Sequence, residues 1–338
     1  MTAPRGRRTA AIDEREFHDW LGRHLTGPAR GLLPLGDDAA ALRVPPGRVA
    51  VLSTDSLVEG THFLPDSPPA RIGAAAANVS LSDLAAKGAQ PAGLLLAVIV
   101  PPGTPRAWVQ ALVRGADRAG AAAGAPLVGG DTKPGAVRAV VSTVLGWSRP
   151  DRLAPRTGAK PGDRLLTTGP VGRGGLAALR LAHAPRSSPK RRRALVDLLA
   201  VQPRLREGRA LAEFAHAMLD TSDGLADASW LMARASGCRV TIEEDRLPFL
   251  SGLRALPVPP PERRAIAFYG GDYELLAAVP AASVQPARTA VRRAGGQLLE
   301  VGRIEPGRDA WLESAGRCHP LPAGGWRPFS RRGPGLMS

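Results

Sequence analysis

Apolar positions in the first half of the chain switch between strand-like runs and helix-like spacing. Phe17, Trp20, Leu21 and Leu25 recur at helical spacing and predict a helix near the start of the chain. Short continuous apolar runs predict buried strands. These runs are "RVAVLSTDSL", "GLLLAVIVP", "APLVGGDT" and "AVRAVVSTVLGW".

Two longer segments between these runs predict helices from the residues at their ends. "SPPARIGAAAANVSLSDLAAKGAQP" opens on prolines and closes with Gly88 and Pro91, which is typical of a helix. "TPRAWVQALVRGADRAGAAAG" opens with Thr104, which we expect to be the N-cap, and Pro105 follows at the first helical position.

The second half of the chain repeats this alternation. "RLLTTG", "CRVTIEE", "YELLAAVP" and "QLLEVGRI" predict strands, the last of them as the final strand. "GRGGLAALRLA" and "SVQPARTAVRRAGG" predict helices, and "AMLDTSDGLADAS" predicts a strand running into a helix capped by Ser222 or Asp223. Alternation in both halves predicts α/β or α+β layers rather than a helical bundle or a β-sandwich.

The stretch "SRPDRLAPRTGAKPGD", residues 148–163, separates the two halves. It is dense in Pro, Gly and Arg and has no apolar period, which is typical of a domain boundary. We therefore predict domains over residues 1–147 and 148–338. A length of 338 residues with 44% hydrophobic residues is enough for two cores.

The formal charge of +15, from 45 basic and 30 acidic residues, raises the possibility of a nucleic-acid partner. The basic residues are scattered, with dense runs only at residues 5–8 and 190–193, and aromatic residues make up 4%. Stacking platforms for bases are therefore not indicated. We expect a solvated, arginine-rich surface and no nucleic-acid partner.

Cysteine usage and hydropathy indicate a reduced, cytoplasmic protein. Cys238 and Cys318 have no partner at metal-binding or redox spacing. The start of the chain has basic residues but no apolar core behind them, and the longest apolar run, residues 94–100, is too short to span a bilayer. We expect no membrane partner.

Ten acidic residues lie in six clusters beside Gly, Ser or Thr, mostly where an apolar run ends. They are Asp37, Asp38, Asp55, Glu59, Asp83, Asp131, Asp220, Asp223, Asp272 and Glu274. Any single cluster is most simply a helix cap or a turn. As a set they indicate a second role, because no Arg or Lys is next to them in sequence.

Asp83 shows what that role is. On a helix it shares a face with apolar Ile72, Ala76 and Val79, so its carboxylate points toward packed surface. A buried carboxylate needs a cation or donors, and Mg²⁺ suits oxygen-only ligands. Neighbouring glycines allow close approach to phosphate. The sequence has no GxxxxGK[ST] and no GxGxxG after a strand, so a nucleotide site would be of another type.

Seven ordered blocks together carry a family resemblance. They are "LGDDAAAL", "STDSLVEGTHF", "ANVSLSDLAAKGAQPAGLLLAV", "LVGGDT", "RTGAKPGD", "LDTSDGLADASWLMARASG" and "GGDYELL". From about Glu14 to Phe329 the chain resembles the thiamine-monophosphate kinase family, which belongs to the superfamily of aminoimidazole ribonucleotide synthase.

The resemblance implies a two-domain PurM-like architecture. Its N-terminal domain is a mixed sheet with helices that forms the dimer interface of a homodimer, and its C-terminal domain is α/β. It also implies transfer of the γ-phosphoryl group of ATP to thiamine monophosphate with several Mg²⁺ ions. We expect direct transfer, with no general base and no covalent nucleophile.

Site residues follow from the resemblance by position in the motifs. The metal-ligand positions are Asp37, Ser53, Thr54, Asp55, Asp83, Asp131, Asp220 and Asp223. The ATP-binding positions are Gly130, Asp131, Arg156 and Ser222. The positions that face thiamine monophosphate are His62, Asp272 and Trp326.

The chain departs from the family pattern at three places. "GGDYEL" has one acid after Gly-Gly, which leaves open whether Asp272 or Glu274 faces the substrate. "GGDTKPG" brings Lys133 near the phosphates, and "GGWRPFS" differs at Trp326. Aminoimidazole ribonucleotide synthase activity, a non-catalytic family member and a basic nucleic-acid-binding protein stay as alternatives.

Overall fold

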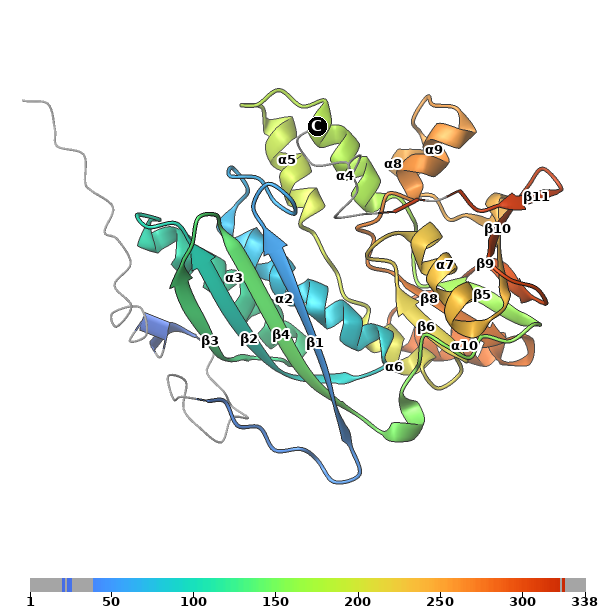
Figure 1. Ribbon diagram of the computed structural model, residues 1–338, viewed down its shortest axis with the longest axis horizontal. Helices are drawn as coiled ribbons and strands as arrows, with labels where there is room; N and C mark the ends of the chain where they lie inside the picture. Colours follow the sequence, from blue (N-terminus) through green and yellow to red (C-terminus); the bar gives the residue numbers. More distant parts are fainter. Residues whose placement is uncertain (1–19, 22, 26–38, 323, 326–338) are drawn as a thin grey trace, which may run out of the picture.

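The computed structural model describes residues 20–21, 23–25, 39–322 and 324–325. Strands and helices alternate along these residues and form two sheets, each with its own helices (Figure 1). The predicted mixed α/β fold is therefore confirmed. The last strand of the first sheet ends at Ser148 and the first strand of the second begins at Asp163. The division of the chain at residue 148 stays a prediction.

The first sheet is mixed and has the strand order β1-β4-β2-β3. Its strands are β1 (Val49–Val58), β2 (Gln90–Val100), β3 (Leu127–Pro134) and β4 (Ala139–Ser148). β4 is antiparallel to both β1 and β2, while β3 is parallel to β2. β1 and β3 are therefore the two edges. Helices α2 (Pro69–Ala86) and α3 (Arg106–Ala123) pack together on one face (Figure 1).

The α2–α3 contact depends on small residues. A Cβ at Gly73 would lie 1.9 Å from the carbonyl oxygen of Leu112, and one at Gly115 would lie 2.0 Å from that of Ala70. The two backbones thus approach more closely than any other residue would allow. The alanine-rich sequence of α2 favours a helix and lets it be buried on several sides.

The second sheet has the strand order β11-β10-β7-β9-β5-β8-β6. Its strands are β5 (Asp163–Thr167), β6 (Ala217–Asp220), β7 (Arg239–Glu243), β8 (Leu275–Pro280), β9 (Leu299–Glu305), β10 (Ala310–Ser314) and β11 (Arg317–Pro320). Its helices are α4 (Arg173–Ala182), α5 (Pro189–Leu198), α6 (Leu205–Leu211), α7 (Leu225–Ser236), α8 (Ser251–Arg254), α9 (Pro260–Ala267) and α10 (Val284–Arg293).

One expectation for the second half was wrong. "QLLEVGRI" does not hold the final strand, since β10 and β11 follow it. In β10, Ala310 and Leu312 are buried while Trp311 and Glu313 are only partly so. Five residues with two buried side chains are too short a pattern to distinguish from a loop. Helices α8 and α9 were not predicted, because the four residues of α8 and the Pro- and Arg-rich sequence of α9 show no clear apolar period.

The two expected helix caps were also wrong. The Thr104 hydroxyl donates to the carbonyl of Pro101 at 2.7 Å, and Pro105 occupies the N-cap of α3 without a side-chain cap. Gly224, with φ of 101°, precedes α7 and likewise provides no side-chain cap. Ser222 and Asp223 are therefore available for another purpose.

Helix α2 joins the two sheets. Its last turn packs against α6 and β6 as well as against the first sheet, and a Cβ at Gly208 of α6 would lie 2.1 Å from the carbonyl oxygen of Ala85. Lys87, the C-cap of α2, donates to the carbonyls of Ala154 and Met218 at 3.2 and 3.0 Å. These contacts hold the end of β6 beside the last turn of α2. No helix in the described part of the chain is long and apolar enough to cross a membrane.

We expect Gly115→Ala to lower the free energy of unfolding by about 1–3 kcal/mol, because the methyl group forces α2 and α3 apart. Thermal unfolding measures the change. Ala122→Ser, at an exposed position of the same helix, is the control and should change stability by less than about 0.5 kcal/mol. Equal midpoints for Gly115→Ala and the wild type would contradict the close contact.

Candidate functional site

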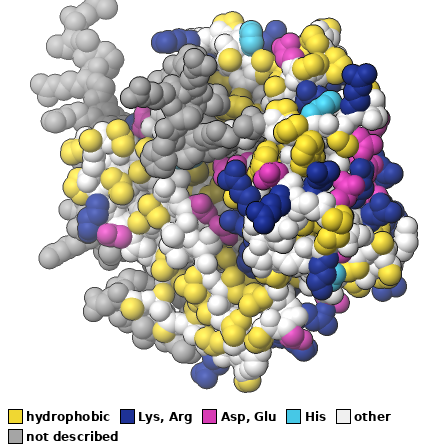
Figure 2. Space-filling model, turned by 45° about the vertical axis from the view of Figure 1, so that its right-hand side comes forward, with side chains coloured by type: hydrophobic (Ala, Val, Ile, Leu, Met, Phe, Trp, Pro, Cys, Tyr) yellow, Lys and Arg dark blue, Asp and Glu magenta, His cyan; other side chains and the backbone are white. Residues whose placement is uncertain are grey.

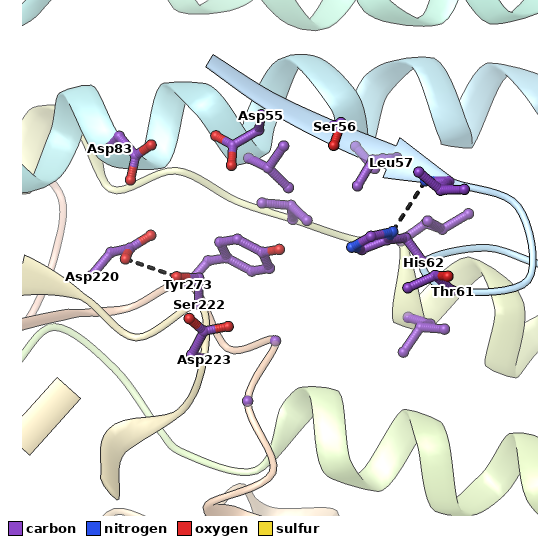
Figure 3. A pocket seen from close by; sticks show the side chains of 18 of the residues that line it. Asp55, Ser56, Leu57, Thr61, His62, Asp83, Asp220, Ser222, Asp223 and Tyr273 are labelled. Carbon is purple, nitrogen blue, oxygen red and sulfur yellow. Dashed lines mark hydrogen bonds between the residues drawn. The ribbon is translucent and has the colours of Figure 1, made fainter. Parts of the chain in front are cut away.

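A cavity of about 670 Å³ lies between the two halves of the chain (Figure 3). Its walls come from β1 and the loop after it, α2, the end of α5, the β6–α7 loop and residues 269–273. Seven residues predicted for the site line it. They are Thr54, Asp55, His62, Asp83, Asp220, Ser222 and Asp223.

Local structure explains why the aspartates converge. Side chains of β1 alternate between the sheet faces, and Asp55 pairs with Ser142, whose hydroxyl bonds to the carbonyl of Ala76 in α2. Asp55 therefore lies on the helix-covered face. Asp83 lies in the last turns of α2, and Asp220 is the last residue of β6.

Hydroxyl groups orient two of these carboxylates. Ser53 donates to Oδ2 of Asp83. Asp220 accepts from Ser82 at Oδ2 (2.6 Å) and from Ser222 at Oδ1 (3.0 Å). A hydroxyl fixes the direction of a carboxylate but does not neutralise its charge.

The carboxylates raise one another's pKa. Burial and then the charge of Asp83 raise the pKa of Asp55 to about 6. Burial raises the pKa of Asp223 to about 6, with contributions from Asp227 and Asp220. The pKa of Asp220 is raised as well, first by burial. Negative charge in this cavity is thus poorly compensated by the protein itself.

These residues fit magnesium bound in its usual manner. Among the described residues, no group of three His, Cys, Asp or Glu side chains is arranged to hold a metal ion alone. Mg²⁺ commonly takes one or two carboxylates and completes its shell with water and substrate phosphate. Separate carboxylates with raised pKa values around one cavity meet that requirement.

Lys87 is a partly buried cation at the aspartate end of the cavity. Burial lowers its pKa to about 8, and Arg156 contributes to the shift, whereas Asp220 and Asp83 oppose it. Arg156 itself is exposed and does not line the cavity.

His62 lies in the loop that follows β1, away from the aspartates (Figure 3). Its Nδ1 accepts a hydrogen bond from the backbone N–H of Val58 at 3.1 Å, so in the neutral ring the proton is on Nε2. Burial lowers the pKa of His62. At neutral pH the ring is therefore an uncharged donor.

Gly130 and Asp131 do not line this cavity. They lie on β3, separated from β1 by β2 and β4, which corresponds to about 14 Å across three strand spacings. Asp131 pairs with Lys133 at 3.0 Å and accepts from the N–H of Thr132 at 2.8 Å.

Asp272 and Glu274 do not line the cavity either. Asp272 is 3% exposed and accepts from the N–H groups of Gly172 and Gly174 at the start of α4. Glu274 is 4% exposed and pairs with Arg204. Asp37 and Trp326 lie outside the described residues.

Sequence reasoning missed Tyr273, which lines the cavity, Ser82, which donates to Asp220, and Lys87, whose charge acts with those of Asp83 and Asp220. Lys87 follows Asp83 by four positions and so shares its helix face, a signal that was present. Tyr273 lies between two acids in "GGDYEL" and lines the cavity.

Residues 36–148 match the family described as AIR synthase related protein, N-terminal domain, and residues 160–312 match the corresponding C-terminal domain. The chain is 36% identical over 320 residues to the thiamine-monophosphate kinase of Caulobacter vibrioides, covering 91% of this chain and 89% of that protein. The chain belongs to the thiamine-monophosphate kinase family.

Solved structures of thiamine-monophosphate kinases share the fold. That from Stenotrophomonas maltophilia K279a has a TM-score of 0.76 at 28% identity and covers 91% of this chain and 99% of its own. A structure described as AaThiL complexed with AMPPCP and TMP has a TM-score of 0.72 at 26% identity, covering 84% and 88%. The family resemblance and the PurM-like architecture are confirmed.

We expect Asp55→Asn to stabilise the protein in magnesium-free buffer at pH 7.5. The pKa of Asp55 is about 6 when folded against 3.8 for the ordinary group, so the folded state binds this proton more tightly. The unfolding free energy therefore falls as pH rises through about 4 to 6. Removing the charge should recover about 1–2 kcal/mol at pH 7.5, after allowing for partial exposure, and little at pH 4.

Asp66→Asn is the matched control for this measurement. Arg191 lowers the pKa of Asp66, so its loss should slightly destabilise the protein at pH 7.5. Thermal unfolding at pH 4 and 7.5 distinguishes the two variants. A lower midpoint for Asp55→Asn at pH 7.5 would refute the repulsion.

Proposed function

We propose that this protein transfers the γ-phosphoryl group of ATP to thiamine monophosphate, giving thiamine diphosphate and ADP. The observation that carries this proposal is the meeting of Asp55, Asp83, Asp220 and Asp223 in a cavity that also contains His62. The related structure with AMPPCP and TMP supports both substrates.

The aspartate end of the cavity suits the phosphate chain of ATP. Asp55, Asp83, Asp220 and Asp223 would hold Mg²⁺, which when bound neutralises the charge of the two substrates. Ser222, at the turn before α7, donates to Asp220 and so orients a carboxylate of this set. Lys87 adds positive charge beside Asp83 and Asp220.

The transfer itself needs no general base. The second pKa of a phosphate monoester is about 6, so the acceptor is mostly a dianion at neutral pH. One of its oxygens forms the new bond to Pγ while the bond from Pγ to the β–γ bridging oxygen breaks, and that electron pair leaves on ADP. The obstacle is repulsion, since two unit charges about 4 Å apart cost about 4 kcal/mol at an effective dielectric of 20. In-line alignment of the two phosphates is what the site must supply.

His62 is suited to the acceptor. Its ring is an uncharged donor at the end of the cavity away from the aspartates (Figure 3). We assign it a contact with thiamine monophosphate, which would leave the aspartate end to ATP.

A homodimer is part of this proposal, and the open face of the first sheet supports it. Leu52 and Leu95 are 65% and 39% exposed, and the register places them on the face opposite Asp55 with Thr54 and Thr143 between them. Asp131, paired with Ala97, is on this same face. Two copies packed face to face would cover the leucines and could bring Asp131 of one copy toward the β1 edge of the other.

The arginine-rich surface gives no support to a nucleic-acid partner. In the run at residues 190–193, Arg191 pairs with Asp66 and Arg193 with Asp197. Figure 2 shows Lys and Arg side chains interspersed with Asp and Glu on the visible face rather than forming one continuous basic surface. A cytoplasmic location stays a prediction.

Purified protein with ATP, Mg²⁺ and thiamine monophosphate should form thiamine diphosphate and ADP in equal amounts. Asp83→Asn and Asp220→Asn should lower kcat by at least about 100-fold. Each removes a carboxylate that would hold Mg²⁺, and the bound Mg²⁺ would offset the repulsion between the two phosphates. Chromatography of the thiamine species and ADP measures both products. Asp66→Asn, outside the cavity, should keep wild-type turnover. Folded wild-type protein that forms neither product would refute the kinase function.

Leu52→Lys combined with Leu95→Lys should convert the protein to a monomer, because the charges would be buried against apolar surface. Sedimentation velocity measures the mass. Arg192→Ala, an exposed change on α5, is the control. A wild-type protein that sediments as a monomer at micromolar concentration would exclude the proposed homodimer.

A further inference from the structure

Tyr273 has a backbone conformation that an aromatic residue rarely adopts. Its φ is 55°, in the left-handed region, where a bulky side chain is strained. The other non-glycine residues with positive φ in the described part of the chain are Asp309 and Ala315, which flank β10 and do not line the cavity. Strain at a cavity wall persists only when the surroundings impose it.

The acidic neighbours of Tyr273 impose it from both sides. Oδ2 of Asp272 accepts from the N–H of Gly172 at 2.8 Å, and its Oδ1 accepts from the N–H of Gly174 at 3.1 Å. Glu274 accepts from Arg204 Nε at 2.8 Å and from the Thr168 hydroxyl at 2.7 Å. Both carboxylates are thus buried and hydrogen-bonded at both oxygens.

The peptide groups around Tyr273 are also held. The buried guanidinium of Arg173 donates from Nη2 to the carbonyls of Gly271 (2.6 Å) and Asp272 (3.0 Å), and from Nη1 to Ala200. The N–H of Glu274 donates to the Thr221 hydroxyl at 3.0 Å. Arg173 therefore ties the turn at residues 271–272 to the segment after α5, and both segments form cavity wall.

The outcome is that the acids point away from the cavity and Tyr273 points into it. Figure 3 shows its ring extending from the aspartate end toward His62. Burial and then the charges of Asp220, Asp55 and Asp223 raise the pKa of Tyr273, and Arg173 opposes them. Burial alone raises the pKa of Tyr269, which also lines the cavity. Tyr273 thus lies where the two substrates would meet.

We propose that Tyr273, and neither Asp272 nor Glu274, is the side chain through which the "GGDYEL" segment contacts the phosphorylated acceptor, with its hydroxyl donating a hydrogen bond to the acceptor phosphate. This inference rests on the proposed kinase function. An anion needs donors, and a carboxylate has none. Asp272, Glu274 and Arg173 are positioning residues that hold the Tyr273 backbone in its strained conformation.

Tyr273→Phe tests the proposal, because it keeps the ring and removes only the hydroxyl. Loss of one hydrogen bond to a charged group should raise the KM for thiamine monophosphate about 10- to 100-fold, while kcat and the KM for ATP change less than about threefold. Calorimetric titration of thiamine monophosphate into protein with AMPPCP and Mg²⁺ should show the same loss of affinity. An unchanged unfolding midpoint confirms that the fold is intact.

Two further variants make the result decisive. Ser229→Ala removes a buried hydroxyl in α7 that bonds to Leu225 and should leave both KM values unchanged. If Tyr269→Phe raises the KM for thiamine monophosphate and Tyr273→Phe does not, the assignment of Tyr273 is wrong. A wild-type protein without thiamine-monophosphate-dependent turnover refutes the kinase function, whereas normal wild-type turnover with an unaffected Tyr273→Phe variant refutes this inference alone.

Asp272→Asn separates positioning from direct contact. The amide NH2 would face the N–H of Gly172 or Gly174, so the variant should lower the unfolding midpoint together with the affinity for thiamine monophosphate. Asp272→Glu, which restores the charge, should recover part of both. Lost affinity with an unchanged midpoint would instead show that Asp272 touches the substrate, and would overturn its assignment as a positioning residue.

Discussion

The close approach of Asp83 and Asp220 is the constraint on which the rest of the structure depends. One residue comes from the last turn of α2 and the other from the end of β6, so the two sheets must pack against the same helix. Gly208 permits that packing, because a larger residue would meet the backbone of Ala85. Bringing two carboxylates out of water without a cation opposes folding. The apolar contacts of α2 must outweigh this repulsion, which explains why so much of a helix that carries an aspartate is buried.

The same constraint connects stability with function. Hydroxyls of Ser53, Ser82 and Ser222 orient the carboxylates and leave their charge in place. A nearby arginine would stabilise the fold but would occupy the oxygens that a metal ion needs. Lys87 instead donates to two backbone carbonyls, so it contributes charge without covering the aspartates. A protein with such a site is less stable without its ligands than with them, because a ligand that binds only the folded state raises the free energy of unfolding.

Sequence patterns predicted the elements that depend on local periodicity and missed those that depend on tertiary contacts. Continuous apolar runs identified the strands of the first sheet, and the face of α2 identified Asp83 as directed toward packed surface. β10 was missed because it is stabilised by pairing with β7, which five residues cannot reveal. The family resemblance predicted that Asp55, Asp83, Asp220 and Asp223 share a site, and Asp131 with them. The position of Asp131 depends on strand order, because β3 lies at the edge opposite β1, and a local sequence pattern does not determine strand order.

The "GGDYEL" segment shows that a motif can locate a segment at the site without identifying which of its side chains faces the cavity. Acidity drew attention to Asp272 and Glu274, yet both carboxylates are hydrogen-bonded within the protein, Asp272 to Gly172 and Gly174 and Glu274 to Arg204 and Thr168. Both acids are anchored away from the cavity, and the residue between them, with its φ of 55°, lines the cavity. In our proposal the acids position Tyr273 and do not contact the substrate. A conformation strained at Tyr273 is the expected consequence, because two anchors determine the backbone between them regardless of what that residue prefers.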